Sequence, residues 1–143
     1  MKNACLVAIA ATIGATPVVA QEYTRIKNRW TGTFINVERG VVEATAIKTG
    51  WHSAQWTVEE TPDGFYRIAN RWTGCYLHIE RGKVECSAAE DGWHSAMWIE
   101  EQAPDGYTRI KNRWKGCYLN IETGPVRCTN IQPGWHSAMW TDQ

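Results

Sequence analysis

The chain has 143 residues, with 15 lysines and arginines against 15 aspartates and glutamates, so its formal net charge is zero. A groove for phosphate backbones requires a basic excess, so this charge balance argues against nucleic acid as a partner. The length fits a single domain. Nine tryptophans are more than so small a core can easily hide, so several should face outward, and exposed aromatic residues need a functional reason.

Residues 1–20 have the pattern of a secretory signal peptide. Lys2 precedes an apolar stretch from Ala4 to Ile13, and small residues follow up to Ala20, after which we expect cleavage. Residues 21–143 would then form the mature domain. The apolar stretch is shorter than the roughly 18 residues of a membrane-spanning helix, and no other segment is long enough. We therefore expect no membrane insertion, and a secreted or periplasmic protein.

The rest of the chain repeats with a period of 42 residues, and its copies span 23–64, 65–106 and 107–143. Each copy contains the motif Arg-Ile-x-Asn-Arg-Trp-x-Gly, then a hydrophobic residue followed by Glu, and it closes on Gly-Trp-His-Ser-Ala-x-Trp. The repetition predicts equivalent structural units, and any site built from these motifs should occur in every copy.

Turn residues divide each copy into four short runs with the composition of β-strands. In the second copy the runs are 65–72, 75–80, 83–87 and 94–100, separated by Thr-Gly, Arg-Gly and Asp-Gly pairs. Such a period also fits a propeller blade, but propellers close with about 4 to 8 blades. Three copies instead predict an all-β fold, the β-trefoil with pseudo-threefold symmetry, whose closed barrel leaves no open sheet edge.

Four cysteines follow Ala20, as one pair in the second copy and one in the third, whereas the first copy has Thr33 and Ala44 at the matching positions. Because each pair is kept or lost together, its members should be bonded to each other. Alternation also brings the two sulfurs of a pair to one face of adjacent strands. Four cysteines allow three connectivities, and secretion favours disulfides over a metal site. The predicted bonds join Cys75 to Cys86 and Cys117 to Cys128.

One glutamate recurs at the end of the second strand of each copy. Alternation sends Leu77 and Ile79 to the core and places Tyr76, His78 and Glu80 on the opposite, solvent face. A carboxylate there can accept two hydrogen bonds from sugar hydroxyls while a nearby indole stacks on the C–H face of the ring. A lone surface glutamate is more simply a solvated charge, but recurrence favours a function. The candidates are Glu38, Glu80 and Glu122.

The tryptophans fall into three types. The last in each copy lies on the closing strand and is predicted to be a core residue: Trp56, Trp98 and Trp140. The first type ends a strand before a turn, and the middle type follows a glycine in a loop. Aromatic residues at strand ends and in loops are the better ligand platforms, so the candidate platforms are Trp30, Trp51, Trp72, Trp93, Trp114 and Trp135.

The closing motif leaves a metal and an enzyme as alternatives. His52, His94 and His136 could converge near the threefold axis and hold zinc, although a loop histidine more often hydrogen-bonds to backbone or ligand. Catalysis needs asymmetric partners, such as an acid with a separate base. The serine after each histidine would point to the opposite face of a strand, where the histidine cannot activate it. We therefore expect neither catalytic residues nor a metal or other cofactor.

The motifs Arg-Ile-Lys-Asn-Arg-Trp, Tyr-Leu-x-Ile-Glu and Trp-His-Ser-Ala-Met-Trp together resemble carbohydrate-binding modules of the β-trefoil type, and look most like family 92. The resemblance covers the whole of residues 21–143. It implies one site in each repeat, with a Trp and a Glu as principal contacts, and β-glucans as ligands, notably β-1,6- and β-1,3-linked ones. It implies Trp30 or Trp51 with Glu38, Trp72 or Trp93 with Glu80, and Trp114 or Trp135 with Glu122.

The related ricin-type lectins usually have Gln two residues before the closing Trp, where this chain has Ala54, Ala96 and Ala138, so their galactose specificity should not be transferred. The sequence therefore predicts a free-standing, monomeric, trivalent binder of polysaccharide or oligosaccharide. The strongest alternative is a secreted trefoil that binds a protein, for example a protease inhibitor, which would present one distinctive loop. A glycoside hydrolase ranks third.

Overall fold

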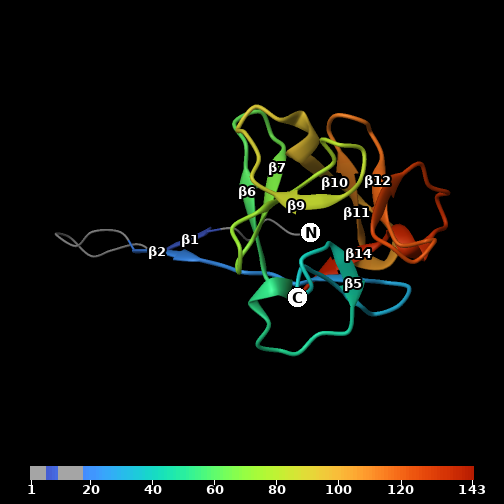
Figure 1. Cartoon of the computed structure of the whole chain (residues 1–143), viewed down its shortest axis with the longest axis horizontal. Helices are drawn as coiled ribbons and strands as arrows, with labels where there is room; N and C mark the ends of the chain where they lie inside the picture. The colour runs from blue at the N-terminus through green and yellow to red at the C-terminus, as the bar shows by residue number, and fades with distance from the viewer. Residues whose placement is uncertain (1–5, 10–17) are drawn as a thin grey trace.

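A computed structural model describes residues 6–9 and 18–143 of the chain, with side chains from residue 22 onward. Strands β1 (Leu6–Ile9) and β2 (Val18–Gln21) form an antiparallel pair of their own, which extends away from the main body (Figure 1). The other parts of the predicted signal peptide lie outside the described residues, and cleavage after Ala20 stays a prediction. No helix in the described ranges has the length and hydropathy needed to cross a bilayer.

The remaining strands come in three groups of four, as the repeat predicts. The first group is β3 (Ile26–Asn28), β4 (Phe34–Asn36), β5 (Glu43–Thr45) and β6 (Trp56–Glu60). The second is β7 (Tyr66–Asn70), β8 (Tyr76–His78), β9 (Glu85–Ser87) and β10 (Trp98–Gln102). The third is β11 (Thr108–Asn112), β12 (Tyr118–Asn120), β13 (Arg127–Thr129) and β14 (Trp140–Asp142).

The first and last strands of each group form a closed barrel. Antiparallel pairing runs from β6 to β7, β10, β11, β14 and β3. A bridge between Thr24 and Trp56 then joins the segment before β3 back to β6. The middle strands form the hairpins β4–β5, β8–β9 and β12–β13, which come together around Val42, Val84 and Val126. This arrangement is the predicted β-trefoil.

A short 3₁₀ helix precedes the last strand of each group, at η1 (His52–Ala54), η2 (His94–Ala96) and η4 (His136–Ala138), and η3 (Pro104–Gly106) forms the turn before β11. The prediction that a strand begins at His94 is therefore wrong. The N–H of Met97 donates to the carbonyl of His94 at 3.1 Å, which winds these residues into a helical turn before β10 begins. The second strand is also shorter than predicted, because the N–H of Ile79 donates to the carbonyl of Ser95 after β8 has ended.

The last tryptophan of each repeat is a core residue, as predicted. Trp56, Trp98 and Trp140 are 0, 1 and 0 % exposed, and they pack with the aliphatic residues of the barrel and hairpins. Each indole N–H donates to the carbonyl of a residue on the hairpin of its own repeat, at 3.0 to 3.1 Å: Ile35, Leu77 and Leu119. A buried indole needs such a partner, so each tryptophan joins the barrel to its hairpin.

The two predicted disulfides are confirmed. Cys75 is bonded to Cys86 and Cys117 to Cys128, in both cases across eleven residues of sequence. Each bond links the residue before the first strand of a hairpin to the second strand, while Thr33 and Ala44 occupy these places in the first repeat. Disulfides persist in oxidising compartments, so they indicate an extracytoplasmic protein.

Replacing Trp98 with Phe should test the role of the buried indoles in the core. The Trp98→Phe variant loses buried volume and leaves the Leu77 carbonyl without its indole donor. We expect the free energy of unfolding to fall by about 2–4 kcal/mol in denaturant titration. The matched control is Trp72→Phe, at a residue 55 % exposed, which should change it by less than about 0.5 kcal/mol. Equal losses in the two variants would contradict this assignment.

Candidate functional site

The two predicted platform types of tryptophan differ in exposure. Trp30, Trp72 and Trp114 are 55, 55 and 47 % exposed, far more than a core aromatic residue. Trp51, Trp93 and Trp135 are half-buried and stand immediately before η1, η2 and η4. Indole surface of both types therefore remains open to a ligand.

A buried serine in each of these helices binds the predicted glutamate. Ser53, Ser95 and Ser137 are each 1 % exposed, and their Oγ donates at 2.6 Å to Oε1 of Glu38, Glu80 and Glu122 respectively. All three glutamates are exposed. The serine fixes one carboxylate oxygen, and the other oxygen can accept hydrogen bonds from a ligand. Sequence reasoning missed this role because it placed the serine on a strand; the signal was its presence in every closing motif.

The backbone of each glutamate is held by a buried side chain two residues earlier. The N–H groups of Glu38, Glu80 and Glu122 donate at 3.1 Å to Asn36 Oδ1, His78 Nδ1 and Asn120 Oδ1, respectively. These acceptor residues are 0, 2 and 3 % exposed. The prediction that His78 faces solvent is therefore wrong, because the strand ends at this residue and its alternation stops there. Each carboxylate is fixed both at its backbone and at Oε1.

The exposed tryptophan beside a glutamate comes from a different repeat. Trp30 of the first repeat lines an open pocket with Glu122, Trp135, His136 and Ser137 of the third. The pocket therefore favours Glu122 as the partner of Trp30, where the sequence offered Trp30 as one of two possible partners of Glu38. The half-buried Trp135, in contrast, shares the pocket with Glu122 of its own repeat, as one of the expected pairings has it.

A buried asparagine in each repeat builds this junction. Asn28 accepts from the N–H of Trp30 at 2.9 Å and donates to the carbonyl of Ser137 at 2.9 Å. Equivalent bonds join Asn70 to Trp72 and Ser53, and Asn112 to Trp114 and Ser95. The same geometry therefore assigns Trp72 to the Glu38 site and Trp114 to the Glu80 site. Sequence reasoning missed these asparagines, although they recur in every Arg-Ile-x-Asn-Arg-Trp motif.

The turn after each glutamate differs in charge between repeats. Arg39 donates two hydrogen bonds to Glu43, and Arg81 donates two to Glu85. These bonds hold the pKa of both carboxyl groups below the usual value. The third repeat has Thr123 and Arg127 at the corresponding positions. The residues that flank the Glu122 site therefore differ in charge from those that flank the Glu38 and Glu80 sites.

The histidines of the closing motifs lie at separate sites. Within the part of the chain that the structure describes, no three His, Cys, Asp or Glu side chains lie close enough together to hold a metal ion. The alternative in which His52, His94 and His136 converge on zinc is therefore wrong. His136 instead lines the Glu122 pocket and is exposed, where its ring can hydrogen-bond to a ligand.

The Glu122 site thus combines one carboxylate, two indoles and one imidazole around an open surface, and the serine and asparagine bonds that build it recur at Glu38 and Glu80. A carboxylate accepts from hydroxyl groups and an indole face covers apolar C–H groups, so the set suits a polyhydroxylated ring. Residues 52–132 match the ricin-type β-trefoil lectin domain-like family. The chain belongs to this family. A comparison with curated proteins finds no match.

Solved structures share the fold of this chain. The GlcNAcα1-4Gal-releasing endo-β-galactosidase from Clostridium perfringens is similar to this chain with a TM-score of 0.77 and 27% identity, over 92% of this chain. This chain spans only 39% of that enzyme. The designed threefold-symmetric protein ThreeFoil aligns with a TM-score of 0.74 and 20% identity, covering 84% of this chain and 96% of ThreeFoil. SeviL bound to asialo-GM1 saccharide gives 0.71 and 22%, covering 85% and 95%.

Replacing Asn28 with Ala should show that the junction between the first and third repeats depends on its side chain. The change removes the acceptor for the Trp30 N–H and a donor to the Ser137 carbonyl in a buried place. We expect a loss of about 2–3 kcal/mol in the free energy of unfolding by denaturant titration. Asn130→Ala, at an exposed position, is the control and should change it by less than about 0.5 kcal/mol. A neutral Asn28→Ala variant would show that the junction does not need this residue.

Proposed function

We propose that the chain is a non-catalytic, trivalent carbohydrate-binding protein with one site at each junction between repeats. The observation that carries the proposal is the pocket in which Trp30, Trp135 and Glu122 meet, with Ser137 fixing the carboxylate. The serine, asparagine and backbone hydrogen bonds that build this pocket recur in the other two repeats. The proposed carbohydrate-binding residues are Trp30, Glu38, Trp51, Trp72, Glu80, Trp93, Trp114, Glu122 and Trp135.

The proposed chemistry at each site is binding without bond cleavage. The free oxygen of the carboxylate accepts from two adjacent sugar hydroxyls, and the exposed indole stacks on the C–H face of the same ring. Glycoside hydrolysis usually uses a pair of carboxyl groups at a set separation, whereas the residues that line the Glu122 pocket include one. The open shape of the pocket also suits a segment within a long polymer.

The proposed ligands are β-glucans, with β-1,6- and β-1,3-linked chains first. Their support is the resemblance to family 92 modules and the alanines at 54, 96 and 138 in place of the glutamine usual in galactose-binding relatives. Two structural relatives act on or bind other glycans: the Clostridium perfringens enzyme releases GlcNAcα1-4Gal, and SeviL is bound to asialo-GM1 saccharide. Galactose-containing glycans are therefore the comparison that a binding experiment must include.

Three sites on one small, secreted monomer would act together on a repeating polymer. If two sites reach the same chain, the second binding step becomes intramolecular and can raise the apparent affinity about 10²-fold or more. Sites facing different directions could also join separate polymer chains. Either outcome follows from valency alone and requires no further contact.

Calorimetric titration should count the sites. With a β-1,6- or β-1,3-linked glucan oligosaccharide, the wild-type protein should bind three molecules, and Glu38→Gln, Glu80→Gln and Glu122→Gln should each weaken one site about 10- to 100-fold. Glutamine keeps an acceptor for the serine hydroxyl but removes the charge, so the fold should be retained. Preference for galactans would contradict the β-glucan assignment, and binding to no glycan would contradict the proposed function.

Paired replacements should show which tryptophan belongs to which glutamate. Trp30 and Glu122 share a pocket, so Trp30→Ala combined with Glu122→Gln should lose one site, the same number as either change alone. Trp30→Ala combined with Glu38→Gln should lose two sites. The stoichiometry from calorimetry distinguishes these outcomes. The reverse pattern would place Trp30 in the site of its own repeat.

A further inference from the structure

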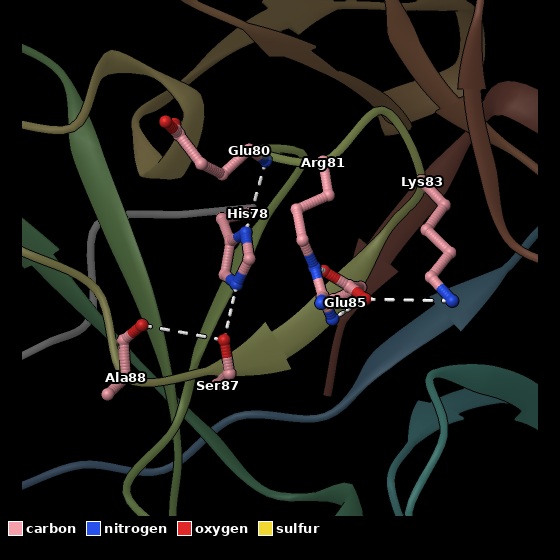
Figure 2. A network of polar contacts seen from close by, with 7 residues as sticks. All are labelled: His78, Glu80, Arg81, Lys83, Glu85, Ser87 and Ala88. Carbon is pink, nitrogen blue, oxygen red and sulfur yellow. Dashed lines mark hydrogen bonds and ion pairs between the residues drawn. The ribbon is translucent and has the colours of Figure 1, made fainter.

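The second repeat differs from the others at the buried residue that holds its glutamate. In the first and third repeats an asparagine side chain donates to a threonine hydroxyl: Asn36 to Thr45 and Asn120 to Thr129. His78 and Ser87 occupy these positions in the second repeat. Figure 2 shows His78 between the backbone of Glu80 and the hydroxyl of Ser87. The first and third repeats, which have asparagine in place of His78, therefore serve as references for the effect of this imidazole on the second.

The partners of His78 define the protonation state of its ring. The N–H of Glu80 can only donate, so Nδ1, at 3.1 Å, must accept and carry no proton. Nε2 lies 2.5 Å from Ser87 Oγ and is then the protonated nitrogen, which donates to the hydroxyl. Ser87 in turn donates to the carbonyl of Ala88 at 3.4 Å. The observed network is that of a neutral imidazole.

His78 also contacts Trp93, a second candidate ligand-binding residue of the same site. Its ring meets that of Trp93 edge-on, with centroids 5.5 Å apart and planes at 73°. The imidazole therefore supports both the glutamate and the half-buried tryptophan of the same site. The matching residues of the other repeats, Asn36 and Asn120, are amides that do not titrate.

We propose that His78 is a positioning residue that makes the Glu80 site, and neither of the other two, weaken on acidification. The inference rests on the proposed function, since it concerns the affinity of one of the proposed sugar sites. A proton on Nδ1 would face the N–H of Glu80, donor against donor, and the bond that holds the glutamate would be lost. The turn that carries Glu80 and the ring of Trp93 would then shift.

Burial and the charges around His78 together set its pKa. Burial is the largest influence and lowers its pKa, Arg81 lowers it further, and the carboxylates of Glu85 and Glu80 oppose this. Glu85 is itself bonded to Arg81 and lies 3.7 Å from Lys83. The net pKa lies below the ordinary imidazole value, so His78 stays neutral at neutral pH and gains its proton only in acid. The exposed His94 beside Ser95 has equivalents in His52 and His136, so its presence does not distinguish the Glu80 site from the other two.

Two single-site proteins test the proposal directly. Glu38→Gln with Glu122→Gln leaves only the Glu80 site intact. Glu80→Gln with Glu122→Gln leaves only the Glu38 site intact, where Arg39 and Glu43 match Arg81 and Glu85. Calorimetry with the glucan oligosaccharide gives the Kd of each at pH 7.5 and pH 4.5. Because both proteins retain one glutamate and one closing-motif histidine at the intact site, the ratio of the two dissociation constants reports what differs between the sites. We expect the ratio to shift at least ~3-fold against the Glu80 site in acid. A ratio independent of pH would overturn the proposal.

The matched variant His78→Asn with Ser87→Thr gives the second repeat the residue pair of the others, and it should fold because both neighbours already carry that pair. In the protein with only the Glu80 site, it should give the pH profile of the Glu38 site. Retention of the acid-dependent loss would show that His78 is not its cause.

A measurement without sugar keeps this proposal separate from the proposed function. In a ¹H–¹⁵N NMR titration, the amide of Glu80 should shift with the same apparent pKa as the His78 ring, while the amides of Glu38 and Glu122 should not show that transition. If no glycan binds but the Glu80 amide follows His78, the proposed function fails and the positioning role stands. If the Glu80 amide does not follow His78, the positioning role fails whatever the protein binds.

Discussion

The candidate sites depend on a buried serine in the 3₁₀ helix of each repeat. The carbonyl of Ser137 accepts from the N–H of Ile121, the residue after β12 of the same repeat, and from the side chain of Asn28 in the first repeat. Its hydroxyl donates to Glu122. A buried polar group must be satisfied, and here each bond joins an element that the site needs. One residue therefore fixes the position of the carboxylate and ties the indole of Trp30 to it.

Closure of the barrel and formation of the sites are the same event. Trp30 lies at the start of the folded domain and Glu122 near its end, and pairing of β3 with β14 brings their repeats together. A single repeat would hold the glutamate and the half-buried tryptophan of a site but would lack the exposed tryptophan that a neighbouring repeat contributes to it. The proposed valency is thus tied to threefold closure. The symmetry is not complete, because His78, Thr123 and Arg127 replace residues that are shared by other repeats.

Several features could be predicted from the sequence because they depend on short-range pattern. The 42-residue period predicts the trefoil, and the absence of both cysteines from the first repeat predicts the two disulfides. The position of Trp98 on a strand predicts its burial. The partners of Trp30 could not be predicted, because a period shows that residues are equivalent but not which copies meet in space. The contact between Ser95 and Glu80 was missed because alternation was carried into residues that form a helical turn. The burial of His78 was missed because its strand ends there.

We propose that the tryptophans divide into three that build the core and six that form sites between repeats. NMR spectra of the indole N–H groups during titration with a β-glucan oligosaccharide test this division. We expect the signals of Trp30, Trp51, Trp72, Trp93, Trp114 and Trp135 to shift on binding and those of Trp56, Trp98 and Trp140 to stay unchanged. Shifts confined to one repeat, or shifts of the buried indoles alone, would contradict it.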